Sequence, residues 1–140
     1  MSIKKMVVAY DGSTGSQKAL VWAVDLALKL KSDVVVVTVV KPPEFSSSVD
    51  EVDEVYTYGE KHCRPLLEKA AAYGEEQGIL LQTEILFGHP AESLVRYAAD
   101  RKADLIVMGT RGMGGFKNLV IGSVAQKVVT YSKVPVTILK

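Results

Sequence analysis

Two hydrophobic patterns alternate along the chain: short unbroken apolar runs, and longer stretches in which apolar residues recur at helical spacing. The runs are rich in β-branched residues and lack the polar alternation of a strand with one wet face. Such runs are typical of strands that are covered on both sides, as in parallel sheets. We therefore predict five strands, at residues 5–10, 33–40, 79–87, 103–109 and 135–140.

Helices are predicted between these strands. The first begins after Ser13 or Thr14, either of which can cap a helix, and its apolar stripe ends at Leu30. A second helical pattern covers residues 52–78, where Pro65 must either kink the helix or start its second part. Two shorter helices are predicted at residues 89–102 and 123–132.

Strands that alternate with helices predict an α/β fold, because crossovers of helical length connect parallel strands. We expect a single domain, residues 1–140, built on a doubly wound five-stranded parallel sheet with helices on both faces. In such sheets ligands bind beyond the carboxyl ends of the strands, where the winding direction reverses. The loops that follow the strands are therefore the candidate binding segments.

Composition excludes several classes of partner. The 17 basic and 16 acidic side chains nearly cancel and form no long block, so neither nucleic acid nor a membrane surface is an expected partner. No uninterrupted apolar stretch reaches the length that spans a membrane. The single Cys63 cannot form an internal disulfide, which suits a reducing compartment and a packing role. We expect a cytoplasmic protein with, at most, a local anion site.

The longest candidate loop lies between the fourth strand and the last helix. Gly109 ends the strand, Gly112 follows after two residues, and Gly122 and Ser123 open the helix after nine more. Glycines let a ligand lie against the main chain, and a helix start offers unpaired N–H groups at the positive end of the helix dipole. This arrangement predicts a phosphate site.

Other residues of the same loop can complete such a site. Ser123 adds a hydroxyl, Val124 adds a main-chain N–H group, and Arg111 and Lys117 supply positive charge. The alternative is that the glycines only fill a loop and that Ser123 is an ordinary helix cap. Two familiar phosphate motifs are absent from the sequence: the Lys-Ser or Lys-Thr pair of a Walker A loop, and the three-glycine dinucleotide fingerprint after the first strand.

The spacing of Gly109, Gly112 and Gly122–Ser123 resembles the G-2x-G-9x-G-[S/T] signature of the ATP-binding branch of the universal stress protein family. Residues 6–20 are similar to that family's opening strand, Asp-Gly-Ser turn and helix. Residues 103–112 and 123–139 are similar to its closing third, so the resemblance covers nearly the whole chain.

The resemblance implies the strand order 3-2-1-4-5, with the switch point between the first and fourth strands, and ATP, with or without magnesium, as the ligand. Asp11 would meet the ribose or, through a metal, the phosphates, and Val39 would offer backbone groups to adenine. Ala9 and Met108 would line the nucleoside pocket. The nucleotide-binding residues implied are Ala9, Asp11, Val39, Met108, Gly109, Arg111, Gly112, Gly122, Ser123 and Val124.

Several of these residues have plainer explanations in the sequence itself. Asp11 is alternatively a turn or cap residue before Gly12, and Val39 is alternatively a core residue. His62 and His89 are far apart and have no carboxylate or thiolate at ligand spacing, so no metal site is expected.

Binding without efficient turnover is the predicted activity. Hydrolysis needs a positioned water and charge stabilisation, and the expected role of Asp11 leaves no evident group to orient the water. The resemblance implies a stress-response regulator with slow or no hydrolysis, at most a weak ATPase. The alternative is a nucleotide-free dimerisation module of the same fold. A phosphoacceptor receiver domain does not fit, because residues 86–90 offer no acceptor aspartate after the third strand.

A homodimer is the expected assembly. The last strand is apolar and β-branched and should lie at the edge of the sheet, where exposed strands need covering or pairing. Residues 134–139 could pair with themselves across a two-fold axis, and the resemblance implies the same contact. A charged residue at Val136 or Ile138 should then yield monomers.

Overall fold

The structure is a computed structural model that describes residues 2–42, 49–110 and 121–140. Strands and helices alternate in these ranges, as the hydrophobic pattern predicts. The strands are β1 (Lys5–Ala9), β2 (Asp33–Val40), β3 (Gln82–Phe87), β4 (Leu105–Gly109) and β5 (Val136–Leu139). The helices are α1 (Thr14–Leu30), α2 (Val49–Tyr58), α3 (Arg64–Gln77), α4 (Pro90–Asp100) and α5 (Ser123–Tyr131), and Gly59–Cys63 is a π-helical segment between α2 and α3.

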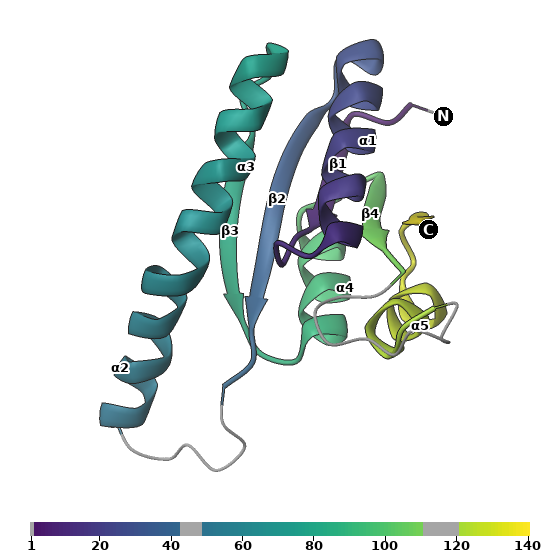
Figure 1. The fold of residues 1–140 in the computed structure, drawn as a ribbon. Helices are drawn as coiled ribbons and strands as arrows, with labels where there is room; N and C mark the ends of the chain where they lie inside the picture. The colour runs from purple at the N-terminus through teal and green to yellow at the C-terminus, as the bar shows by residue number, and fades with distance from the viewer. Residues whose placement is uncertain (1, 43–48, 111–120) are drawn as a thin grey trace.

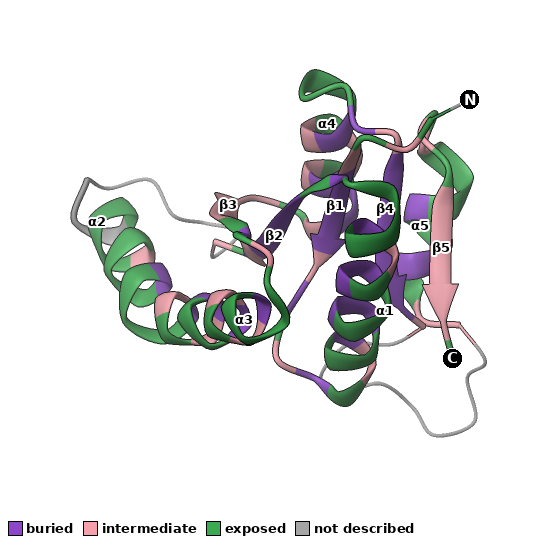
Figure 2. Cartoon of the chain, turned by 90° about the horizontal axis from the view of Figure 1, so that it is seen from above, coloured by how far each residue is buried: buried purple, intermediate pink, exposed green. Residues whose placement is uncertain are grey.

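All five strands form one parallel sheet in the order β3-β2-β1-β4-β5; β3 to β4 can be followed in Figure 1, and all five are labelled in Figure 2. The central strand β1 pairs with β2 on one side and β4 on the other, and Val8 is in register with both Val36 and Val107. The chain therefore winds outward in one direction through β2 and β3, and in the other through β4 and β5. The switch point lies between β1 and β4, so the predicted fold class and strand order are confirmed.

Helices cover both faces of the sheet (Figure 2). Met6 and Val8 of β1 belong to a core cluster with residues of α1 and α3, whereas Val7 belongs to a second cluster with residues of α4 and α5. Met6, Val7 and Val8 are all fully buried, because successive side chains of a strand point to opposite faces. This double burial explains why the strands read as continuous apolar runs.

The third strand begins later than the sequence pattern predicts. Residues 79–81 precede β3, and Leu80 is 83% exposed. The cause is the end of α3: Gly78 adopts φ 90°, and the Ile79 N–H donates to the carbonyl of Gly74 over 2.9 Å. This closure of the helix uses the first N–H group of the apolar run, so that group cannot pair with β2.

The second helical pattern is interrupted just before Pro65, as expected of a helix with an internal proline. In the π-helical segment the Arg64 N–H donates to the carbonyl of Gly59, five residues back, and Pro65 then lies in the first turn of α3. Proline has no N–H group to donate and its ring crowds the preceding turn, which accounts for the widened turn at this position. The helix starts at Val49, three residues earlier than predicted.

The end of α1 also differs from its predicted apolar stripe. Leu30 is 46% exposed, whereas the stripe residues Ala19, Leu20, Ala23 and Ala27 are buried. Ser13 is the N-cap, and its Oγ accepts from the Ser16 N–H over 3.2 Å. No helix in the described ranges is long and apolar enough to cross a membrane.

Candidate functional site

Two hydrogen bonds to β2 hold the chain in place where it leaves β1 at the switch point. The Tyr10 N–H donates to the carbonyl of Val37 over 2.8 Å, and the hydroxyl of Thr38 donates to the carbonyl of Tyr10 over 2.6 Å. Thr38 is 5% exposed, so this second bond lies in the interior. Together the two bonds fix the position of Tyr10 and so of Asp11, the second residue beyond the carboxyl end of β1.

Asp11 begins a turn that leads into α1. Its Oδ1 accepts from the Ser13 N–H over 2.9 Å, and Gly12 adopts φ 83°, which favours glycine. The structure thus supports the turn role that the sequence offers for Asp11, and the side chain remains exposed at the sheet edge. Burial, followed by the charge of Asp11, raises the pKa of the adjacent Tyr10 phenol above its usual value.

Gly109, at the end of β4, has a packing role of its own. A Cβ built on Gly109 would lie 2.7–2.9 Å from backbone atoms of Gly15 in the first turn of α1. Such distances are closer than real side chains tolerate, and the neighbouring atoms are main chain. Glycine is therefore required at position 109 for α1 to approach β4, whether or not a ligand is bound.

The two ends of the predicted glycine loop meet in the structure. The Gly122 N–H donates to the carbonyl of Thr110 over 2.6 Å, and the Thr110 N–H donates to the carbonyl of Leu139 over 3.1 Å. These bonds place the start of α5 directly beside the end of β4. Gly109 and Gly122, which are well separated in the sequence, therefore lie close together next to the switch point.

Helix α5 begins without a side-chain cap from the described residues. Gly122 is the N-cap, with φ −76° and ψ 168°, and its carbonyl accepts from the Gln126 N–H. Because the Gly122 N–H already bonds to Thr110, the N–H groups that remain for an anion are those of the first turn, beginning with Ser123 and Val124. Ser123 is exposed, so its hydroxyl is accessible beside them.

The three apolar site residues lie on one face of the sheet. Met108 belongs to the core cluster under α4 and α5, and Ala9 and Val39 are half-buried against the same cluster, as is Val124. The packing role weighed for Val39 is thus observed. These residues form a continuous apolar floor on the side of the sheet where α5 starts.

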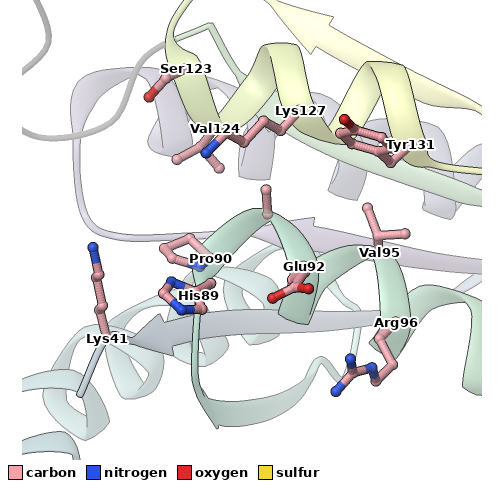
Figure 3. Close-up of a pocket in the computed structure, with 11 residues that line it drawn as sticks. Lys41, His89, Pro90, Glu92, Val95, Arg96, Ser123, Val124, Lys127 and Tyr131 are labelled. Carbon is pink, nitrogen blue, oxygen red and sulfur yellow. The ribbon is translucent and has the colours of Figure 1, made fainter. Parts of the chain in front are cut away.

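A cavity of about 530 Å³ adjoins this site between α4 and α5 (Figure 3). Ser123 and Val124 are part of its wall, together with Lys41 and His89, which the sequence reasoning did not place in the site. Lys41 directly follows β2, and His89 is the N-cap of α4 after β3. Both occupy loops after strands, and that position is the sequence signal that could have found them.

The remaining residues that the sequence singles out are three loop residues and two residues of the α2–α3 region. Arg111, Gly112 and Lys117 lie outside the described residues. His62 stacks on Tyr58 in the α2–α3 region, and the described ranges contain no cluster of three or more metal-binding side chains. Cys63 is buried, and burial raises the pKa of its thiol.

Comparison with known proteins agrees with this geometry. The sequence matches the model of the universal stress protein family over residues 2–140. Universal stress protein MJ0531 of Methanocaldococcus jannaschii is 34% identical over 142 residues, covering 98% of this chain and 82% of that protein. UspA from Lactobacillus plantarum shares the fold, with a TM-score of 0.90, 23% identity and coverage of 100% and 99% of the two chains.

A universal stress protein solved in complex with cAMP is also similar, with a TM-score of 0.77, 28% identity and coverage of 100% of this chain and 99% of that one. The parallel sheet, which winds outward in both directions from β1 and β4, defines the class of doubly wound α/β proteins. Within that class the chain belongs to the universal stress protein family, as the glycine spacing predicts.

The close approach of Gly109 to Gly15 predicts that a side chain at position 109 destabilises the fold. Gly109→Ala should lower the free energy of unfolding of nucleotide-free protein by about 1–3 kcal/mol, because the added methyl group must displace backbone of α1. Urea denaturation monitored by circular dichroism measures this loss. A loss below about 0.5 kcal/mol, the usual range of a neutral surface substitution, would contradict the packing role.

Proposed function

We propose that this protein binds an adenine nucleotide, ATP in the first instance, at the β1–β4 switch point and acts as a regulatory module of the stress response. The phosphates lie against the first turn of α5, and the nucleoside lies over the apolar floor of Ala9, Val39 and Met108. Asp11 faces the ribose or a phosphate-bound magnesium ion. Gly112 and Arg111 complete the phosphate contacts from the glycine loop.

One observation carries most of this proposal: the hydrogen bond between the Gly122 N–H and the Thr110 carbonyl. It brings the start of α5, which has no side-chain cap among the described residues, to the carboxyl edge of the sheet. There the N–H groups and the helix dipole favour a phosphate. The spacing of the glycines, which matches the ATP-binding signature, supports the same ligand. The relative solved with cAMP supports an adenine nucleotide as the class of ligand.

Gly122→Val tests the phosphate contact. The backbone angles of Gly122 are open to any residue, so valine fits the main chain while its side chain covers the start of α5. We expect the dissociation constant for ATP to rise at least about tenfold, because hydrogen bonds to a charged group are lost. Isothermal titration calorimetry measures the change.

The matched control is Thr130→Val, on the same helix. Thr130 is exposed, and its hydroxyl donates to the Gln126 carbonyl one turn back in α5. This variant should bind ATP like the wild type. Unchanged ATP affinity in Gly122→Val, with both variants folded, would exclude the α5 start as the phosphate site. Mass analysis of denatured wild-type protein provides a second test, since the nucleotide-free module would release no adenine nucleotide even after incubation with magnesium-ATP.

Slow turnover follows from the surroundings of Asp11. One oxygen of this carboxylate already accepts a main-chain hydrogen bond that holds the turn, so the group is poorly suited to orient an attacking water. We expect steady-state ATP hydrolysis below about one per second, the lower end of ordinary enzymes. Phosphate release from purified protein measures the rate. A rate of about one per second or faster would overturn the assignment as a binding module.

We further propose that β5 mediates a homodimer. This strand lies at the edge of the sheet and pairs only with β4 within the described chain. The carbonyl of Pro135 accepts from Ile106 of β4 and that of Leu139 from Thr110, just after β4. The alternation of a parallel strand therefore directs the N–H and carbonyl groups of Val136 and Ile138 to the open edge. Their side chains pack against the core, however. The charged substitutions predicted from the sequence would therefore disturb folding as well as pairing.

A cleaner test compares Ile138→Pro with Ile138→Ala. Both remove the packed side chain, but only proline removes the outward N–H group, which an edge strand tolerates. Sedimentation should show a dimer for the wild type and the alanine variant, and a monomer for the proline variant. A folded proline variant that remains dimeric would show that β5 is not the interface.

A further inference from the structure

The open edge of β5 offers too few hydrogen bonds to hold a second copy of the chain by itself. Val136 and Ile138 direct two N–H groups outward per copy, so two copies paired along β5 form at most four hydrogen bonds. A hydrogen bond that replaces one to water contributes little net free energy, whereas association costs translational and rotational freedom. The side chains of Val136 and Ile138 are packed against the core of their own copy. A stable dimer therefore needs apolar contacts from the helices beside β5.

Trp22 of α1, the single tryptophan of the chain, is one apolar side chain on this side of the molecule. The main chain of Gly15 in α1 lies against Gly109 of β4, so this side of the helix faces the half of the sheet that contains β4 and β5. Trp22 follows Gly15 by seven residues, about two turns, and therefore lies on the same side of α1. Figure 2 shows β5 alongside α1. Trp22 is 36% exposed, whereas the neighbouring Ala23 is buried.

Val129 of α5 is an apolar side chain on the other face of the sheet. Val128 is buried in the core, and Lys127, one residue earlier, is part of the cavity wall shared with α4. Successive residues turn by about 100° around a helix, so Val129 points to the opposite side from Lys127, away from α4. Because α4 contacts β2 and α5 contacts β5, the side away from α4 is the open edge of the sheet. Val129 is 49% exposed.

Two-fold pairing of β5 brings both residues to the boundary between two copies. A two-fold axis through the paired strands joins the two sheets into one and keeps both copies of α1 on one face and both copies of α5 on the other. Trp22 then lies on the side of α1 that faces the second copy, and Val129 lies on the corresponding side of α5. The edge of β5 and the two helices beside it therefore form one continuous surface.

We infer that Trp22 and Val129 bind a second copy of this chain, one on each face of the sheet, and supply the apolar contact that the β5 edge lacks. The inference rests on the homodimer proposed above and specifies the side chains that stabilise it. Removal of partly exposed apolar surface from water favours association, and tryptophan is enriched among the residues that dominate the binding energy of protein interfaces.

Trp22→Gln and Val129→Glu test this contact independently on the two faces. Val129 is about half exposed, so glutamate at this position of α5 should leave the fold intact. Each variant should raise the dimer dissociation constant at least about tenfold, as expected when a central interface residue is lost. Sedimentation equilibrium over a range of protein concentrations measures the constant, and circular dichroism checks the fold.

Val21→Gln is the matched control on α1. Val21 is 50% exposed and lies one turn after Gln17, whose amide donates to the carbonyl of Gly12 over 2.9 Å. Gly12 is next to Leu66 of α3, so Val21 lies on the side of α1 away from β5. This variant should keep the dissociation constant of the wild type. An equal rise in Val21→Gln and Trp22→Gln would overturn the placement of the contact beside β5.

Fluorescence of the wild type reports on Trp22 without any substitution, because the chain has no other tryptophan. Dilution that dissociates the dimer should shift the emission maximum to longer wavelength as Trp22 becomes exposed to water. Emission that stays unchanged through dissociation would overturn the role of Trp22.

Comparison with Ile138→Pro separates this inference from the proposed strand pairing. If Ile138→Pro is monomeric while Trp22→Gln and Val129→Glu stay dimeric, the β5 dimer stands and the contact through the two helices fails. If Ile138→Pro is dimeric while Trp22→Gln and Val129→Glu dissociate, the strand pairing fails and the helical contact stands. A wild type that is monomeric at every concentration would overturn both.

Discussion

The parallel pairing of β1 with β4 is the constraint on which the rest of the site depends. Because both strands run in the same direction, their carboxyl ends meet at one edge, and the chain must leave that edge in opposite directions. Asp11 and Gly109 are brought together in this way, although 97 residues separate them along the chain. The same edge receives the start of α5 through the bond between Gly122 and Thr110. In sheets of this topology such an edge is where ligands bind, so the topology alone makes it the candidate site before any side chain is considered.

Glycines at this edge serve two different physical purposes. Gly109 is needed because α1 passes too close to β4 for a side chain, so its requirement concerns folding. Gly122 occupies backbone angles that any residue adopts, and it adds no side chain at the start of α5. A motif that combines both glycines therefore mixes a packing constraint with the proposed binding constraint. Loss of nucleotide binding therefore reports on ligand contact only when Gly122 is substituted, because a substitution at Gly109 also disturbs folding.

The fold was predictable because a strand that is buried on both faces of the sheet has an apolar residue at nearly every position. The runs around Val7, Val35 and Ile106 are apolar at every position, and this excludes a strand with one wet face. The start of β3 was not predictable from the same signal, since Ile79 is as apolar as a strand residue but its N–H closes a helix. Local hydrogen bonding at Gly78 and Ile79 decided that boundary, and hydrophobic periodicity carries no information about it.

The candidate site was predictable in part, for a related reason. The glycine spacing and the Asp-Gly-Ser turn are each local sequence patterns, so Asp11, Gly122 and Ser123 could be proposed as site residues without coordinates. Lys41 and His89 come from other loops and line the cavity beside Ser123 only through the strand order and the packing of α4 on α5. Their positions after β2 and β3 make them candidates in the sequence, but their place in the cavity wall depends on tertiary geometry.

The central claim is that the start of α5, held against the end of β4, seats the phosphates of an adenine nucleotide. A crystal structure of the protein grown with magnesium-ATP tests this claim most directly. The account predicts phosphate oxygens within hydrogen-bonding distance of the N–H groups of Ser123 and Val124, with the ribose beside Asp11. A nucleotide bound elsewhere on the molecule, or an α5 start that stays free of ligand at saturating nucleotide, would contradict it.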